Sequence, residues 1–397
     1  MQCFLNICIL VEEEVIQILS AVTTDGEIII PAQYPKTFLN DLRVNTTFFC
    51  LQCSEKVILK NGMIKIPHFA HISNISCTQT FSEGESEDHL KGKLHLFEFL
   101  QKYSLPVHLE AYLPFLQQRP DLYVQSESDP LAIEFQCSQI PAKMIERRTE
   151  GYITKQITPL WILRTPKPSD FPLQEIGTMK LSYYRQQFFY TTPNGKIILT
   201  YCPQSRYFHY ISTPMHVKAT NYIVKVRKLS LKKQSWPFAI LKKITWEEFQ
   251  KYLTIYKNLR FKHIDNLYLF NRKGIRSPFL QVCYKWRIHP QKVPLFIGIP
   301  SDGASIFSCH AIEWQIQFID HLHKRGITIQ QAKVQHCETF LFYRRLSPNI
   351  TVEHITAVEK YLHILQRCLI SSEKVIFDSN INYSLMKQLL YSEFLAN

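Results

Sequence analysis

Apolar and polar residues alternate in two neighbouring runs, residues 119–124 and 131–138, which a polar connection rich in Ser, Glu and Asp separates. This pattern predicts a β-hairpin or two neighbouring strands. Alternation places Asp121 on one face of the first strand, and Glu134 and Gln136 on one face of the second. Two carboxylates that point from adjacent strands at one place repel each other unless a cation lies between them. Mg²⁺ and Mn²⁺ take such oxygen ligands, so the two runs predict a divalent-cation site.

The patterning around these strands predicts a mixed α/β unit. Ser82 and Glu85 form a capping box, so a helix is expected to begin there. On this helix Glu85, His89 and Lys93 share one face. That face is either solvated and salt-bridged or one wall of a phosphate site. The remaining elements are expected in the order strand, helix and apolar central strand, at residues 107–113, 140–153 and 159–163.

The N-terminal part is expected to be a small β module. Asp25-Gly26 lies between two apolar runs and predicts a hairpin. Asn61-Gly62 predicts a second hairpin between residues 57–59 and 64–66.

Cysteine and histidine residues around this second hairpin have near-finger spacing. Two thiolates and two imidazoles would close a tetrahedral structural Zn²⁺ site. The sequence offers five candidates for four places, and the alternative is a set of unrelated buried Cys and surface His residues. The expected ligands are Cys50, Cys53, His71 and, as the fourth, His68, with Cys77 as its alternative.

Residues 164–172 form the clearest linker, and the chain beyond it contains strand-like pieces up to about residue 230 and then mainly helical patterns. We therefore expect an α/β (α+β) protein with three parts: residues 1–80, residues 81–165, and a mainly helical part at 173–397. The 11 cysteines are mostly isolated in apolar context, which is typical of reduced thiols. No convincing signal peptide or membrane-spanning apolar run is present, so a cytoplasmic protein is expected.

The formal net charge is +13, which favours a polyanionic partner. Residues 201–290 hold 18 Lys and Arg against 3 Asp and Glu. Cations interleaved with Tyr, Phe and Trp can neutralise phosphates and stack unpaired bases. The alternatives are an ordinary solvated surface over an aromatic core, or a membrane-surface site, for which no strongly basic amphipathic helix is evident. The residues expected to bind DNA are Lys225, Arg227, Lys228, Lys232 and Lys233.

Seven motifs occur in a fixed order over residues 50–163: CxxC, HFAH, ESxxHxxxK, RxD, ExQxS, Arg followed by Tyr, and WIL. This order resembles the competence protein CoiA family. The resemblance implies a zinc-finger-like N-terminal module, a PD-(D/E)xK restriction-endonuclease-like mixed-sheet core and a basic C-terminal domain. It also implies a role in natural transformation, close to the DNA-uptake machinery at the inner face of the membrane. Residues 1–17 extend beyond the usual family start. The family's motif residues fall on Glu85, Ser86, His89, Lys93, Asp121, Glu134, Gln136, Ser138, Arg148 and Tyr152.

Two functions are expected from these residues. In the first, the protein is a metal-dependent deoxyribonuclease in which Asp121 and Glu134 hold Mg²⁺ or Mn²⁺ and Glu85 is a further carboxylate. His89, Lys93, Arg148 and Tyr152 would contact phosphate or DNA. In the second, the protein is a non-catalytic adaptor that delivers single-stranded DNA to a recombinase. The choice depends largely on Gln136, because it stands where Lys is usual and carries no charge.

Overall fold

The computed structural model describes residues 17–63, 65–72, 86–238, 241–270, 277–344, 349–371 and 380–396. The chain forms two compact units, which we describe separately. Unit 1 contains residues up to Thr165 together with Leu199–Phe208 and Leu229–Ala239, and unit 2 contains the rest. Unit 1 thus joins the first two parts expected from the sequence, whereas the division into three domains stays a prediction.

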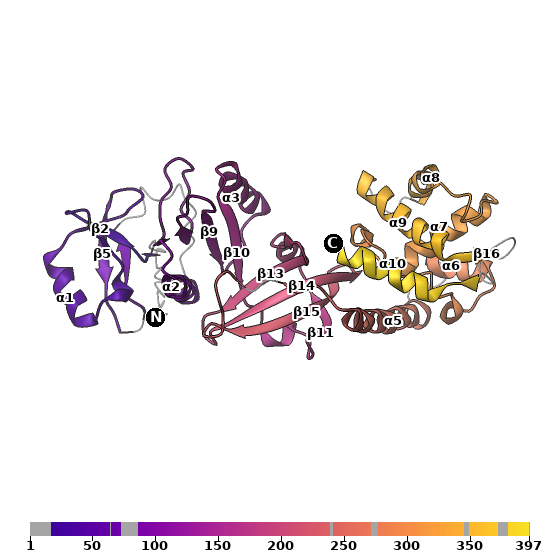
Figure 1. Cartoon of the computed structure of the whole chain (residues 1–397), viewed down its shortest axis with the longest axis horizontal. Helices are drawn as coiled ribbons and strands as arrows, with labels where there is room; N and C mark the ends of the chain where they lie inside the picture. Colours follow the sequence, from indigo (N-terminus) through magenta and orange to yellow (C-terminus); the bar gives the residue numbers. More distant parts are fainter. Residues whose placement is uncertain are drawn as a thin grey trace, which may run out of the picture. The chain divides into compact units, whose positions relative to one another are not determined.

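Unit 1 begins with a six-stranded antiparallel sheet (Figure 1). The hairpin predicted at Asp25-Gly26 is confirmed, because β2 and β3 pair across a turn in which Gly26 has φ 84°. Helix α1 (Lys36–Asn45) connects β3 to β4. In sheet order the strands are β1 (Gln17–Ile18), β6 (His68–His71), β5 (Lys56–Lys60), β4 (Phe48–Phe49), β2 (Ala21–Thr23) and β3 (Ile28–Ile29).

The second predicted hairpin is only half right. Strand β5 forms, and its alternately exposed and buried residues follow the sequence pattern. Its partner is β6, at His68–His71, and the described residues Lys65 and Ile66 are not in a strand. The Cys/His motif therefore lies within the sheet and does not merely follow it.

A mixed sheet forms the second half of unit 1. Strands β7, β8 and β9 are antiparallel, whereas β10 runs parallel to β9 and to the end of β13 that belongs to this unit. The predicted buried central strand is confirmed as β10. The elements are α2 (Glu87–Gln101), β7 (Val107–Leu109), β8 (Leu122–Val124), β9 (Leu131–Gln136), α3 (Ala142–Thr154), β10 (Thr158–Arg164) and β13 (Gly195–Cys202).

Helices α2 and α3 cover opposite faces of this sheet. Phe135 of β9 faces α2 so closely that a Cβ atom on Gly92 would lie 2.0 Å from its ring. The neighbouring Glu134 faces the other way and meets Arg148 and Tyr152 of α3. The alternation of β9 thus gives each helix its own set of contacts.

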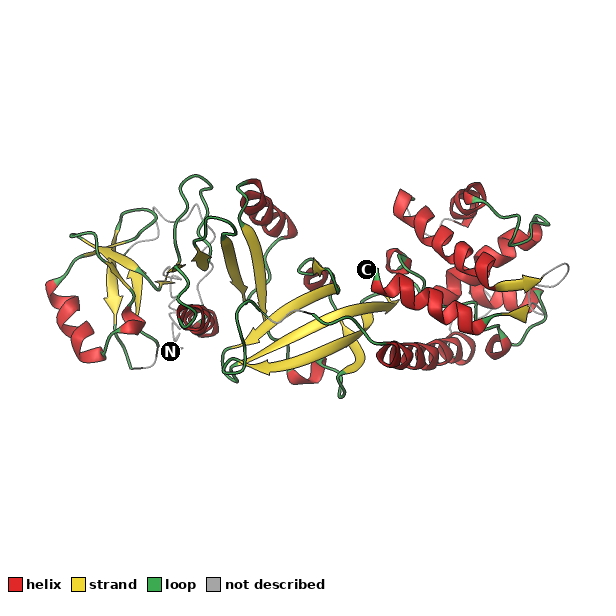
Figure 2. Ribbon diagram, viewed as in Figure 1, coloured by secondary structure: helices red, strands yellow, loops and turns green. Residues whose placement is uncertain are grey.

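Unit 2 contains its own strands and a helical part with an extensive apolar core (Figure 2). Strand β11 pairs antiparallel with β15, and β12 with β13. The strands are β11 (Ile176–Lys180), β12 (Tyr190–Thr192), β14 (Tyr207–Lys218), β15 (Asn221–Ser230), β16 (Leu369–Ser371) and β17 (Asn380–Ile381). The helices are α4 (Tyr183–Gln186), α5 (Trp246–Leu269), α6 (Pro278–Lys285), α7 (Ala311–Lys324), α8 (Val334–Arg344), α9 (Val352–Cys368) and α10 (Tyr383–Leu395).

These elements confirm the expected α+β class, with an N-terminal sheet, a mixed-sheet core and a helical C-terminal part. Among the described helices, none combines the length and the apolar character that crossing a bilayer requires.

Candidate functional site

The sheet register brings Asp121 and Glu134 together. In the β8–β9 ladder Leu122 lies opposite Ile133. One step further along the same register places Asp121, the residue before β8, opposite Glu134 of β9. Both line a cavity of about 680 Å³. The predicted pair of carboxylates on adjacent strands therefore faces one space.

Three groups hold the Asp121 carboxylate. Its Oδ2 accepts hydrogen bonds from the Phe135 amide at 2.7 Å and from His89 Nε2 at 3.2 Å. Lys93 Nζ lies 3.8 Å from Oδ1. Burial raises the pKa of Asp121, but the charges of His89 and Lys93 and the Phe135 amide outweigh it, so the net pKa is well below the usual range. Asp121 is therefore ionised at neutral pH.

Lys93 is not on a solvated face, because its side chain is 0 % exposed. Its ammonium group is bound to the carboxylate of Glu110, which is 2 % exposed. Glu110 also accepts a hydrogen bond from the Leu19 amide at 2.8 Å and donates its own amide to the Asp121 carbonyl at 3.0 Å. The sequence gave no sign of Glu110, which lies outside every motif and has a left-handed φ of 53°.

Glu134 is held from the opposite face by two residues of α3. Its Oε1 accepts from Arg148 Nη2 and from the Tyr152 hydroxyl, each at 2.5 Å. Arg148 also donates to the Arg119 carbonyl at 3.0 Å. Burial raises the pKa of Glu134 to about 7, although the Arg148 charge opposes the shift. Arg148 and Tyr152, predicted to contact DNA, thus hold a carboxylate.

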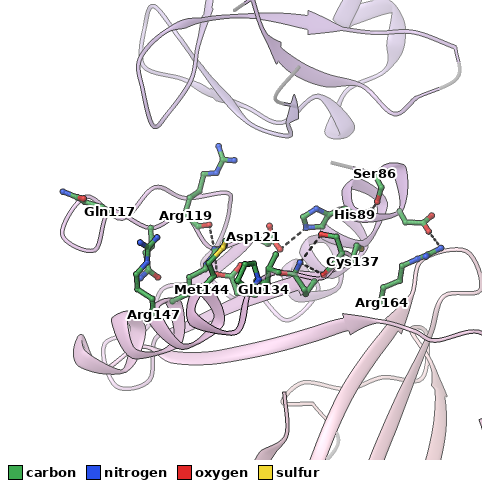
Figure 3. A pocket seen from close by; sticks show the side chains of 17 residues that line it. Ser86, His89, Gln117, Arg119, Asp121, Glu134, Cys137, Met144, Arg147 and Arg164 are labelled. Atoms are coloured by element: carbon green, nitrogen blue, oxygen red, sulfur yellow. Dashed lines mark hydrogen bonds and ion pairs between the residues drawn. The ribbon is translucent and has the colours of Figure 1, made fainter. Parts of the chain in front are cut away.

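Gln136 lies at the end of β9, and its amide is turned back along the chain. Gln136 Nε2 donates to the Ser138 carbonyl at 2.9 Å. In Figure 3, Asp121, Glu134 and Cys137 lie in the middle of the group, with His89 on one side and Arg147 on the other. The cations that line the cavity besides Arg148 are Arg119, Arg147 and Arg164, the last of which pairs with Asp88 at 2.5 Å. Such a cavity suits a phosphodiester, whose charge the arginines can bind.

The two carboxylates fit a hard divalent cation by their donor chemistry. Among the described residues, Asp121 Oδ1 and Glu134 Oε2 accept no hydrogen bond. Two carboxylate oxygens, completed by water and phosphate, are a usual Mg²⁺ set. Glu85, predicted as a further carboxylate, lies outside the described residues.

A second group of side chains fits a soft metal. The ligand atoms of Cys50, Cys53 and His71 all lie within 4.8 Å of one another. Cys53 Sγ is 3.4 Å from His71 Nε2, and the Gln52 amide donates to Cys50 Sγ at 3.4 Å. An amide that points at a cysteine sulfur stabilises the thiolate form that binds a metal. These three are the ligands that the sequence favoured.

The structure does not bring His68 to this cluster. His68 and His71 are three positions apart in β6, so they point to opposite faces of the sheet. His68 Nδ1 is bonded to the Ile66 carbonyl at 2.8 Å, and burial lowers the pKa of His68. Cys77, the alternative, lies outside the described residues.

The five basic residues predicted to bind DNA differ in their surroundings. Lys225 is paired with Glu248 at 2.5 Å and with Glu175 at 3.5 Å in unit 2, so its charge is already balanced. The other four have exposed side chains and lie at Arg227 and Lys228 in unit 2 and at Lys232 and Lys233 in unit 1.

Comparison with known proteins gives two family matches. The profile of the "Competence protein CoiA, nuclease-like domain" matches residues 85–244, and that of the "Competence protein CoiA, N-terminal domain" matches residues 31–80. Competence protein CoiA of Bacillus subtilis (strain 168) is 35 % identical over 161 residues, which cover 41 % of this chain and 42 % of the relative. The match thus spans about two fifths of the curated relative's length. No solved structure matches.

Proposed function

Because this chain belongs to the competence protein CoiA family, we propose that it acts on incoming single-stranded DNA in natural transformation. It promotes the processing or recombination of that DNA, and its nuclease-like centre is the cavity at Asp121 and Glu134. The observation that carries the proposal is the placement of two buried carboxylates opposite each other in one cavity with several arginines. Such a cavity combines the oxygen ligands of a hard cation with groups that bind phosphate.

In this centre Asp121 and Glu134 hold Mg²⁺ or Mn²⁺, which polarises a phosphate and lowers the pKa of a bound water. Each side chain around them has a separate task. Lys93 and His89 keep Asp121 ionised and fixed, while Arg148 and Tyr152 fix Glu134. Arg119 and Arg147 line the cavity where they can bind the substrate's phosphate groups.

The test is cleavage of end-labelled single- and double-stranded DNA by the full chain with Mg²⁺ or Mn²⁺. Asp121→Asn and Glu134→Gln keep the shape of each side chain and should reduce the cleavage rate about 100-fold or more, since even second-shell substitutions cost 10–100-fold. Glu127→Gln is the matched control, because Glu127 is an exposed carboxylate in the connection between β8 and β9. Equal cleavage by all three variants would refute the assignment of the centre.

A second function, the non-catalytic adaptor, is favoured by Gln136. Its amide is bonded to the Ser138 carbonyl, and it brings no charge to the cavity. The adaptor predicts DNA binding without cleavage in either metal, both in the native chain and in Gln136→Lys, which restores the usual motif. The nuclease predicts that the native chain cleaves DNA and that Gln136→Lys cleaves it at least as fast. In both functions, DNA binding should use the exposed cations Arg227, Lys228, Lys232 and Lys233 more than the balanced Lys225.

A further inference from the structure

The helical part of unit 2 has a cluster of aromatic side chains in solvent. Phe342 and Tyr343 near the end of α8 are 70 % and 65 % exposed, and their rings lie 5.5 Å apart. Tyr284 near the end of α6 is 77 % exposed. Large apolar rings in water are unfavourable in a surface with no partner, so neighbouring exposed rings indicate a binding surface.

Beside these rings a single carboxylate gathers three cations. Asp320 of α7 is 1 % exposed and pairs with Lys285 of α6 at 2.7 Å, Lys324 of α7 at 3.0 Å and Arg344 of α8 at 2.8 Å. Burial raises the pKa of Asp320, but hydrogen bonds from Lys285 and Lys324 lower it more, so the net pKa is low and the group is ionised. Helices α6 and α8 both pack against α7, which lies among the orange helices of Figure 1.

Arg325 joins the rings to the cations. Its guanidinium lies 5.2 Å from the centre of the Tyr343 ring, and its Nη1 is 3.1 Å from His321 Nδ1. We call the six residues Lys285, Lys324, Arg325, Phe342, Tyr343 and Arg344 the Asp320 patch.

The charge of this patch exceeds what folding requires. One cation would neutralise Asp320, yet four cations surround it and the rings, so the patch keeps a surplus of positive charge. Lys285 and Lys324 remain 43 % and 49 % exposed, so they can bind a ligand while Asp320 holds them. Exposed cations bind phosphates, and exposed rings stack on unpaired bases.

We propose that the Asp320 patch is a binding platform for single-stranded nucleic acid, with phosphates at Lys285, Lys324 and Arg344 and bases stacked on Phe342 and Tyr343. The proposal rests on the proposed function in that the strand is the incoming DNA, but it places a binding surface in unit 2, built from residues that the nuclease-like centre does not use. Asp320 acts as a positioning residue, because it holds the three cations together from beneath.

The experiment measures binding of a fluorescein-labelled oligo(dT) of about 20 nucleotides, enough for one platform of ~4–16 nucleotides. Anisotropy is recorded with the full chain over a salt series, without added divalent metal. One variant carries Phe342→Ala with Tyr343→Ala, and another carries Lys285→Ala with Lys324→Ala. The matched controls are Tyr183→Ala, which removes a ring that is 64 % exposed on α4, and Lys251→Ala with Lys387→Ala, which removes two exposed lysines from α5 and α10. Circular dichroism checks that each variant is folded.

The aromatic variant should weaken the Kd about tenfold or more, because each stacked base contributes substantially. The lysine variant should reduce the slope of log affinity against log salt by about 1.4, since each phosphate contact adds about 0.7 on single strands. Both controls should bind like the native chain. The aromatic variant does not touch Asp320, so it keeps the test valid if the lysine variant misfolds.

The outcomes separate the two proposals. If the native chain binds the oligonucleotide and both patch variants bind equally well, the platform is refuted and the proposed function stands. If the native chain does not bind single-stranded DNA at all, the proposed function fails, and the platform fails with it. If the patch variants instead lose self-association while their DNA binding is unchanged, the patch is a protein interface and the platform is again refuted.

Discussion

Lys93 offers a sharp test of how the nuclease-like centre is held together. Lys93→Met keeps the length and apolar stem of the side chain but removes its charge. Glu110 is then left 2 % exposed without its cation, and Asp121 loses a charge 3.8 Å from its Oδ1. Removing one partner of a buried ion pair costs about 3–5 kcal/mol, because the remaining charge stays desolvated. For a unit of this size the loss corresponds to a fall in Tm of about 6–20 °C.

The assay is urea unfolding followed by hydrogen exchange of peptides from residues 87–136, which report unit 1 separately from the helical unit. Lys91→Met is the control on the same helix. The Lys91–Glu87 ion pair is 40 % and 45 % exposed at its two ends, so its loss should cost about 0.5 kcal/mol or less.

A double variant isolates the cause. Lys93→Met with Glu110→Gln removes both charges but keeps an oxygen that can accept the Leu19 amide. It should be more stable than Lys93→Met alone by about 2 kcal/mol or more, because no unpaired charge remains at Glu110. A loss below about 1 kcal/mol in Lys93→Met, or a double variant that is no more stable than the single one, would refute the reasoning.

Two further predictions concern the metal cluster and pH. The purified chain should hold about one zinc, which Cys50→Ser and His71→Ala remove while His68→Ala and the control Cys202→Ser keep it, as elemental analysis would show; loss of zinc in His68→Ala would contradict the strand-face argument. His95 is bonded to the Tyr201 hydroxyl, and burial lowers the pKa of His95 to about 4. The unfolded chain therefore binds a proton between about pH 6.5 and 4 that the folded chain does not. Unit 1 should lose stability as the pH falls through this window, and denaturation of His95→Gln should show a shallower dependence; equal slopes would refute the assignment.

Local patterns were enough to predict much of unit 1. Alternation gave the two strands and the faces of Asp121 and Glu134, and the turn pair Asp25-Gly26 gave the first hairpin. The partner of β5 was misplaced, because the apolar run at residues 64–66 looked more strand-like than His68–His71, where two histidines interrupt the pattern. Strand alternation could still have separated His68 from His71, since residues three apart in a strand face opposite ways.

Long-range pairings were beyond the sequence. Glu110 lies 17 positions from Lys93 and 91 from Leu19, and no periodicity links these three. Asp320 likewise collects its cations from three helices, 35 positions away at Lys285 and 24 at Arg344. Charge counting located the basic region but could not say which lysines are balanced, as Lys225 is, and which remain available.

Gln136 therefore has a more specific meaning than the sequence alone gave it. The lysine of the usual motif is absent from β9, but an ammonium group is present near Asp121, supplied by Lys93 from α2. That ammonium is 0 % exposed and bound to Glu110, so it stabilises the carboxylates and cannot reach a substrate in solvent. The cations that can meet a phosphate are the arginines that line the cavity. If the centre cleaves DNA, the charge that develops in the transition state must be met by them and by the metal, which is why Gln136→Lys distinguishes a nuclease from an adaptor.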